Sequence, residues 1–180
     1  MKILLKKLLK KFNGLRIGVF IDSSNIYHAQ KRSGWKVDYK KLKNFISKYG
    51  NLKIYNFYAA VPRKSDPAYA PTNKYLNAVR KIARLKTKPL KYIKEGNKIY
   101  KKGDVDLEIA IDVVRSIDNL DLVVVTSGDS DYLELKNWVT KDKNKKIVFA
   151  AFENNMAWEI RQCWHIYLNR IKDKIEVIIK

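Results

Sequence analysis

Aspartates in three separate parts of the chain are the residues best suited to chemistry. Asp22 follows the apolar run 16–21, Asp129 and Asp131 follow the apolar run 120–126, and Asp104 and Asp106 stand at the start of an apolar stretch, 105–117. Two carboxylates about 4 Å apart repel each other by about 4 kcal/mol at an effective dielectric constant near 20. If the fold brings these aspartates together, the cluster needs a cation.

The chemistry of these candidate ligands selects the kind of cation. Oxygen ligands without His or Cys suit a hard divalent ion, Mg²⁺ or Mn²⁺, which keeps several of its waters. Such an ion lowers the pKa of a bound water, orients a phosphate and neutralises the charge that develops in an in-line displacement. The reaction class that follows is hydrolysis of a phosphodiester.

The elements around these aspartates place them at one edge of a sheet. Alternating strand and helix patterns predict an α/β fold, a three-layer sandwich with a mainly parallel central sheet. In such a sheet the ligand site lies beyond the carboxyl ends of the strands. We expect strands at 16–21, 52–61, 120–126, 146–152 and 166–168, a hairpin formed by 88–94 and 98–102, and helices near 26–31, 38–49, 72–85, 105–117, 132–140 and 156–163.

Charge is distributed unevenly along the 180 residues. The chain has 38 Lys and Arg against 18 Asp and Glu, for a net charge of +20. Residues 104–134 nevertheless contain nine acidic residues and one basic residue, Arg115, so the rest of the chain is strongly positive. This excess of basic residues predicts a polyanionic partner, either nucleic acid or an anionic membrane surface.

Length and composition indicate one domain. A chain of this size buries a sufficient core without disulfides, and the single Cys163 cannot form a disulfide framework or a zinc site. We assign residues 15–180 to one domain and residues 1–14 to a basic amphipathic extension that packs on the domain or on a partner. The sequence contains no run of eighteen apolar residues, so we predict no transmembrane segment. A cytoplasmic location is expected. A homodimer is compatible with the sequence.

Three motifs together resemble a known family. They are FIDSSNI at 20–26, KGDVDLEIAID at 102–112 and TSGDSDY at 126–132. In order and spacing they are similar to the NYN domain of the LabA-like group, which belongs to the PIN-like nucleases. The resemblance covers about residues 15–170.

This resemblance implies a fold, an activity and a ligand set. The fold would be PIN-like, and the activity that of a metal-dependent ribonuclease. Our own prediction is an endoribonuclease that cleaves single-stranded or locally unpaired RNA, with single-stranded or structured RNA as its partner. Carried over by position, Asp22, Asp106, Asp129 and Asp131 would be catalytic and would hold one or two Mg²⁺ or Mn²⁺ ions. Asn25 would orient the phosphate or the attacking water.

Each aspartate also has a structural interpretation. Asp22 and Asn25 are both favoured as helix caps, and acidic groups such as Asp129 and Asp131 are favourable at a helix start. Asp104 is better placed to cap the helix after it than to bind metal.

Asp112 and Ser127 are second candidates. Asp112 lies about 120° around a helix from Asp106. It is therefore interpreted as a residue that supports a metal ligand, as a structural residue, or as a ligand if the helix tilts. Ser127 could hydrogen-bond a ligand carboxylate or the substrate. His28 and His165 are interpreted as isolated surface or structural residues.

Basic residues near the expected site are candidate phosphate contacts, although most lysines could instead form a diffuse solvated surface. The candidates are Lys31, Arg32, Arg63, Lys64, Lys101 and Lys102.

Two further functions are alternatives. The first is a catalytically inactive RNA-binding regulatory module with the same fold. The second, a phosphatase of the haloacid dehalogenase type, is disfavoured because Ser24 stands where such enzymes have a second aspartate.

Overall fold

A six-stranded parallel sheet forms the centre of the molecule in a computed structural model that describes residues 7–96 and 98–178. Its strand order is β3-β2-β1-β6-β7-β8, and each neighbouring pair is parallel. Strands β4 and β5 form a separate antiparallel hairpin. The strands are β1 (Arg16–Asp22), β2 (Asn51–Val61), β3 (Arg84–Pro89), β4 (Lys91–Glu95), β5 (Lys98–Lys102), β6 (Leu122–Val125), β7 (Lys146–Ala151) and β8 (His165–Tyr167).

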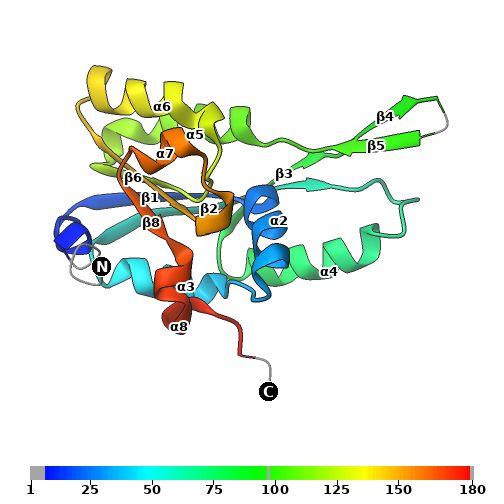
Figure 1. Cartoon of the computed structure of the whole chain (residues 1–180), viewed down its shortest axis with the longest axis horizontal. Coiled ribbons are helices and arrows are strands. Elements are labelled where there is room, and N and C mark those ends of the chain that lie inside the picture. The colour runs from blue at the N-terminus through cyan, green and yellow to red at the C-terminus, as the bar shows by residue number, and fades with distance from the viewer. Residues whose placement is uncertain (1–6, 97, 179–180) are drawn as a thin grey trace.

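Helices cover both faces of this sheet, which confirms the predicted three-layer α/β sandwich (Figure 1). One face packs against α2, α3, α4 and α8, and the other packs against α5, α6 and α7. The helices are α2 (Ser23–Ser33), α3 (Tyr39–Ser47), α4 (Tyr69–Arg80), α5 (Asp106–Ser116), α6 (Leu133–Asn137), α7 (Trp158–Arg161) and α8 (Lys172–Ile175). Single helical turns lie at Ile117–Asn119, Ser130–Tyr132, Trp138–Asp142, Glu153–Asn155 and Leu168–Ile171.

The direction in which the chain builds the sheet reverses at β1. From β1 the chain adds β2 and β3 on one side, then crosses to add β6, β7 and β8 on the other. Strands β1 and β6 are therefore neighbours although about 100 residues separate them in sequence. A crevice forms at the carboxyl ends of the strands where the winding reverses, and ligands bind there in open α/β sheets.

Alternating side chains of the central strands fill the two cores. In β1, Ile17, Val19 and Ile21 are buried on the face covered by α2 and α3. Phe20 points to the opposite face and joins Val123 of β6 in the second core. Because both faces are covered, these strands are apolar on both sides, as parallel strands usually are.

The region between residues 69 and 95 differs from the prediction. A helix was expected over 72–85, but α4 ends at Arg80 and residues 84–89 form the parallel edge strand β3. The hairpin is shorter, because its first strand begins at Lys91 rather than at 88. The polar sequence of β3 concealed it, since an edge strand has fewer buried positions than a central one. Asn97, in the expected hairpin turn, lies outside the described residues.

Part of the N-terminal extension packs on the domain. Residues 7–10 are helical, and Leu9 and Phe12 are buried in the core on the α3 side of the sheet. Residues 1–6 lie outside the described residues. Within the described ranges, no helix is both long enough and apolar enough to cross a bilayer.

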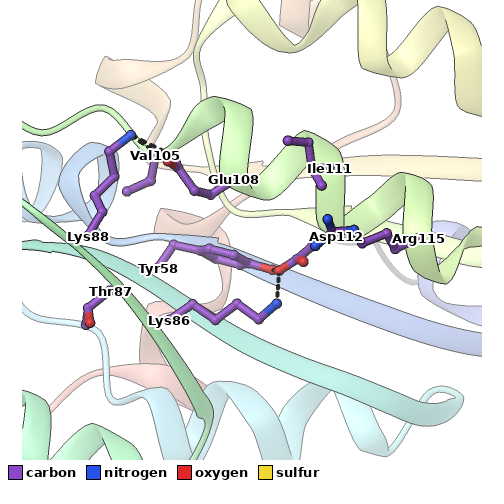
Figure 2. Close-up of a pocket in the computed structure, with 9 residues that line it drawn as sticks. All are labelled: Tyr58, Lys86, Thr87, Lys88, Val105, Glu108, Ile111, Asp112 and Arg115. Carbon is purple, nitrogen blue, oxygen red and sulfur yellow. Dashed lines mark hydrogen bonds and ion pairs between the residues drawn. The ribbon is translucent and has the colours of Figure 1, made fainter.

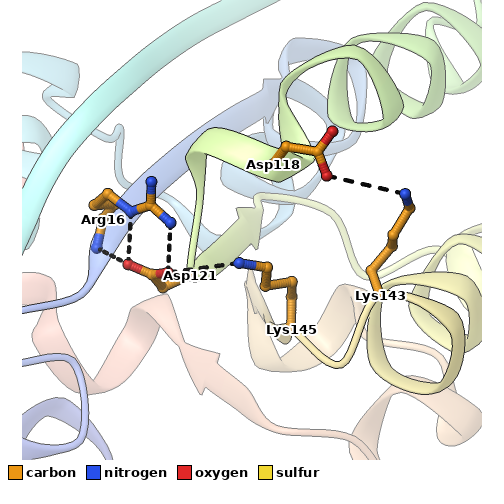
Figure 3. Close-up of polar contacts among 5 residues, drawn as sticks. All are labelled: Arg16, Asp118, Asp121, Lys143 and Lys145. Carbon is orange, nitrogen blue, oxygen red and sulfur yellow. Dashed lines mark hydrogen bonds and ion pairs between the residues drawn. The ribbon is translucent and has the colours of Figure 1, made fainter.

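Ionic contacts join the strands at the amino edge of the sheet, opposite the crevice (Figure 3). The Arg16 side chain donates from Nε and Nη2 to the two carboxylate oxygens of Asp121, each at 2.9 Å, and its backbone N–H donates to Oδ2. Lys145 Nζ lies 3.6 Å from Asp121 Oδ1. These contacts tie the start of β1 to the start of β6 and hold the pKa of Asp121 well below its ordinary value.

Candidate functional site

Polar side chains from four segments surround a cavity of about 220 Å³ at the carboxyl edge of the sheet. The segments are the β1–α2 junction, the residues leading into α5, the loop after β6, and the turn after β7. The lining residues are Asp22, Ser24, Asn25, His28, Asp104, Asp106, Asp129 and Asn155. Three of the four aspartates predicted as metal ligands, Asp22, Asp106 and Asp129, thus line one cavity.

Asp22 both caps a helix and lines the cavity. Its Oδ1 accepts hydrogen bonds from the backbone N–H groups of Ser24 and Asn25 and from the Ser24 hydroxyl, each at 3.1 Å. The side chain is buried, and burial raises its pKa. The N–H of Asn25 opposes that rise, and the negative charge of Asp106 adds to it. The structural and the functional interpretations of Asp22 are therefore compatible.

Asp106 occupies the first turn of α5 and is held by a buried tyrosine. The Tyr132 hydroxyl donates to Asp106 Oδ1 at 2.9 Å. Burial raises the pKa of Asp106, the hydrogen bond from Tyr132 opposes the rise, and the charge of Asp129 adds to it. Tyr132 is 1% exposed, so its ring is not available to stack on a base.

The loop that carries Asp129 is positioned by an amide of α2. Asn25 Oδ1 accepts from the Gly128 N–H at 3.2 Å and from Asn155 Nδ2 at 2.9 Å. A Cβ on Gly128 would approach Met156 Cα to 2.7 Å and the Asn155 carbonyl oxygen more closely still. Only glycine lets the two loops approach this closely, and the amide oxygen of Asn25 joins them.

Three of the cavity aspartates have no positively charged partner within the described part of the chain. Asp22, Asp106 and Asp129 make no ion pair there, whereas the acidic residues at the amino edge do. Perturbed pKa values of buried groups in a cleft are typical of functional sites. The fold thus gathers carboxylates at this edge and leaves the charges of these three uncompensated.

Asp112 does not belong to this cluster, which argues against a role as a ligand. It lines a different cavity, of about 400 Å³, between β3 and α5 (Figure 2). Its Oδ2 lies 2.5 Å from Lys86 Nζ and accepts from the Tyr58 hydroxyl at 2.5 Å. Burial would raise the pKa of Asp112, but these two partners outweigh it and lower the pKa. These contacts favour the structural interpretation of Asp112.

Asp104, Asp131 and Ser127 lie at the margin of the cluster. No side chain caps α5, so Asp104 is not the predicted cap; it lines the cavity and pairs with Lys102 at 3.2 Å. Asp131 is exposed and does not line the cavity, although its charge contributes to the raised pKa of Asp106. Ser127 is buried, and its hydroxyl accepts from the Asp129 N–H at 3.3 Å.

The basic candidates divide into two groups. Arg32 contacts Asn155 Oδ1 at the cavity, and Lys31 lies over the ring of Tyr27 on the same helix. The other group surrounds the base of the β4–β5 hairpin and includes an exposed Lys64. In that group Arg63 stacks on Tyr92, Lys101 pairs with Asp66, and Lys102 pairs with Asp104.

Three cavity residues were not predicted from the sequence. Ser24 and His28 line the cavity one helical turn apart on α2, at a spacing that could have been recognised. Asn155 lies in the turn that follows β7. The rule that ligands bind beyond the carboxyl ends of parallel strands could have indicated it.

The donors in the cavity are suited to a hard cation, but they are loosely arranged. Among residues 7–96 and 98–178, no three His, Cys, Asp or Glu side chains are grouped as metal ligands usually are. The carboxylate and amide oxygens of Asp22, Asp106, Asp129 and Asn25 nevertheless match what Mg²⁺ and Mn²⁺ prefer. An open arrangement is compatible with Mg²⁺, which often binds one or two carboxylates and retains several waters.

The fold and the cavity define an α/β sandwich protein with an acidic crevice at the carboxyl edge of its sheet. The chain belongs to the NYN domain family, whose sequence profile matches residues 16–169. This match confirms the resemblance drawn from the three motifs.

Two known proteins are similar to this chain over most of its length. The low amplitude and bright protein LabA of Synechococcus elongatus is 28% identical over 171 residues, covering 92% of this chain and 90% of LabA. The crystal structure of VPA0982, a protein of unknown function from Vibrio parahaemolyticus, has a TM-score of 0.74 at 20% identity. That likeness, over 92% of this chain and 98% of VPA0982, supports the fold alone.

Proposed function

We propose that this protein is a metal-dependent endoribonuclease that hydrolyses phosphodiester bonds of RNA at the Asp22–Asp106–Asp129 cavity. The observation that carries the proposal is the convergence of these carboxylates from distant segments without a compensating cation in the described residues. The whole chain has a net charge of +20, so a polyanionic substrate is attracted to the molecule. Membership of the NYN family supports the same reaction class.

The side chains of the cavity have distinct tasks in this proposal. Asp22, Asp106 and Asp129 hold the ion, and Tyr132 keeps Asp106 in place through its hydroxyl. When bound, Mg²⁺ or Mn²⁺ supplies an acidified water and neutralises charge on the phosphate. The amide oxygen of Asn25 is already used within the protein, so its NH₂ group is the part that faces substrate. Arg32, at the rim, contributes to phosphate binding.

Substitutions with asparagine test the assignment of the carboxylates. Asparagine caps helices as well as aspartate does, so Asp22→Asn keeps the cap and removes only the charge. We expect Asp22→Asn and Asp129→Asn each to abolish Mg²⁺- or Mn²⁺-dependent cleavage of a labelled RNA while RNA binding persists. Cleavage that survives both substitutions would show that the site is assigned wrongly.

Thermal melting tests ion binding without relying on activity. An ion that binds only the folded state raises the melting temperature, and the rise increases with the logarithm of the ion concentration above its dissociation constant. We expect MnCl₂ to raise the melting temperature of the wild-type protein and to have little effect on Asp106→Asn. An equal rise in both proteins would mean that the ion binds elsewhere.

The second candidate function is RNA binding without catalysis. It is favoured by the loose arrangement of ligands in the described residues, where no ready-made metal group is found. RNA binding by the purified protein without Mg²⁺- or Mn²⁺-dependent cleavage of varied RNAs would establish it in place of the nuclease.

A further inference from the structure

The β4–β5 hairpin is an arm that extends from the body of the protein. Its two strands pair with each other and with no strand of the central sheet. Figure 1 shows the hairpin projecting beyond the carboxyl edge of the sheet, on the side where β1 ends and α2 begins. Each strand has five residues, so the arm is about 17 Å long at roughly 3.4 Å per residue.

Both faces of this arm are open to solvent. All described residues from Lys91 to Lys102 are exposed except Tyr92, which is half-buried. A two-stranded hairpin without a packed face is marginally stable in water. An element of this kind is well suited to bind a partner that covers it.

The charge of the arm indicates which partner covers it. Five lysines stand against one acidic residue, Glu95. Lys91 and Lys102 lie directly opposite each other in the ladder, and like charges at such positions are unfavourable. Lys91, Lys94 and Lys98 have no ion pair in the described part of the chain. A polyanion lying along the arm would compensate these charges.

Apolar side chains between the lysines favour a single-stranded polymer. Ile93 and Tyr100 face each other across the ladder, with 40% and 49% of their surfaces exposed, and Ile99 is 56% exposed. Aromatic and apolar groups alternating with cations are typical of surfaces on which the bases of single strands stack. Paired bases within a duplex do not present their faces in this way.

The base of the arm is fixed next to the acidic cavity. Strand β5 leads through Gly103 to Asp104, which lines the cavity and pairs with Lys102. On the other side, Asp66 accepts a hydrogen bond from the Tyr92 hydroxyl at 2.7 Å and pairs with Lys101 at 2.7 Å. A strand bound along the arm is therefore directed towards Asp104 and the cavity.

We infer that the β4–β5 hairpin is an RNA-binding arm that holds the single-stranded segment flanking the scissile phosphate. The choice of RNA as the polymer rests on the proposed nuclease function. The arm itself is argued from its lysines, its exposed apolar residues and its junction with the cavity.

Direct binding measurements with matched variants test this inference. The arm variant combines Lys91→Gln, Lys94→Gln and Lys98→Gln. The control has the same charge change at three exposed lysines near the amino edge of the sheet, Lys48→Gln, Lys53→Gln and Lys146→Gln. The probe is a fluorescein-labelled 20-nucleotide oligouridylate, measured by anisotropy in EDTA over a salt series, with melting temperatures recorded for both variants.

We expect the arm variant to bind this RNA at least tenfold more weakly, and the control less than threefold. Three lost phosphate contacts should reduce the slope of log K against log salt by about 2, at about 0.7 per contact. Tyr100→Ala should weaken binding without changing that slope. Equal losses in the arm and control variants would overturn the inference, since net charge alone would then explain binding; so would normal binding by the arm variant.

Two further results would also overturn the inference that the arm binds single-stranded RNA, while leaving the nuclease proposal intact. One is an equal dependence on the arm lysines with a 20-base-pair RNA duplex, which would remove the single-strand assignment. The other is a wild-type dimer in sedimentation that the arm variant converts to a monomer, because a second copy would then cover the hairpin. Conversely, arm-dependent RNA binding without any metal-dependent cleavage would refute the nuclease proposal and support RNA binding by the arm.

Discussion

The hydroxyl of Tyr132 donates a hydrogen bond to Asp106 Oδ1 across 2.9 Å, joining the helical turn after β6 to the first turn of α5. The tyrosine is almost fully buried, and its partner Asp106 lines the acidic cavity. It positions one carboxylate while leaving its charge in place. The contact shows how a chain can hold carboxylates together without neutralising them.

Tyr132→Phe tests this positioning. The substitution keeps the ring and removes the donor, and we expect RNA cleavage to fall about tenfold because a lost hydrogen bond to a charged group costs about 1–3 kcal/mol. The control is Tyr55→Phe, which removes the hydrogen bond from a buried hydroxyl to the Tyr39 carbonyl in the other core. It should lower the melting temperature without changing cleavage. Equal cleavage by both variants would argue against a role for Tyr132.

Two aspartates of α5 should respond differently to the same substitution. Asp106→Asn is expected to abolish cleavage with little loss of stability, because a repelled carboxylate is removed. Asp112→Asn weakens the contact with Lys86 and is expected to cost about 1–3 kcal/mol of unfolding free energy while cleavage persists. Urea unfolding and an RNA cleavage assay measure the two effects. The reverse pattern would place the site in the cavity between β3 and α5.

Asn155 should matter although the sequence did not single it out. Its side-chain Nδ2 donates to Asn25 Oδ1 and its Oδ1 accepts from Arg32, so Asn155→Ala releases both the α2 amide and a rim cation. We expect RNA cleavage to fall about tenfold. The neighbouring Asn154 is exposed, and its one hydrogen bond within the described residues is from the Ser33 hydroxyl, at 3.5 Å, so Asn154→Ala is the control and should stay within twofold of wild type. Similar activities of the two variants would contradict the prediction.

The contact between Arg16 and Asp121 should make stability depend on pH. The pKa of Asp121 is held below its ordinary value near 3.8, so the contribution is fully present at neutral pH. It is lost as the pH falls below 3.8 towards the lower pKa of the folded state. Asp121→Asn should lower the melting temperature by about 2–4 °C at pH 7, the shift that a loss of about 1 kcal/mol causes in a chain of this size. The decrease should be smaller at pH 3.

Asp118→Asn is the control for that measurement. Asp118 is largely exposed and lies 3.9 Å from Lys143, a contact too weak and too solvated to stabilise the fold measurably. Its melting temperature should follow the wild type at every pH. A difference between Asp121→Asn and wild type that stays constant down to pH 3 would mean that ionisation of Asp121 is not the cause.

Much of the fold could be predicted from the sequence because its central strands are buried on both faces. The apolar runs that became β1, β6 and β7 are short, β-branched and bounded by polar residues, and such a pattern indicates a parallel strand. The edge strand β3 lacked that pattern, since its half-buried positions include Lys86 and Lys88, and Thr87 and Pro89, which alternate with them, are exposed. A strand at the edge of a sheet therefore has a weaker hydrophobic pattern in its sequence than a central strand.

The gathering of aspartates at strand ends was likewise predictable, because parallel strands present their carboxyl ends at one edge. Which of the acidic residues keep an uncompensated charge was not predictable. Asp112 and Asp121 carry the same side chain as Asp106 and lie in the same acidic segment, yet each is paired with a basic residue from a distant strand or loop.

The sequence by itself determined the α/β class, the family motifs and the presence of carboxylates at the ends of β1 and β6. Only the tertiary structure decided that Asn155 lies beside these carboxylates and that Asp112 lies apart from them and pairs with Lys86. It also decided that the lysine-rich hairpin lies beside the cavity. The physical reason is that periodicity and strand ends are local properties of a chain. Charge compensation depends on pairs of residues that meet only when the whole sheet has formed.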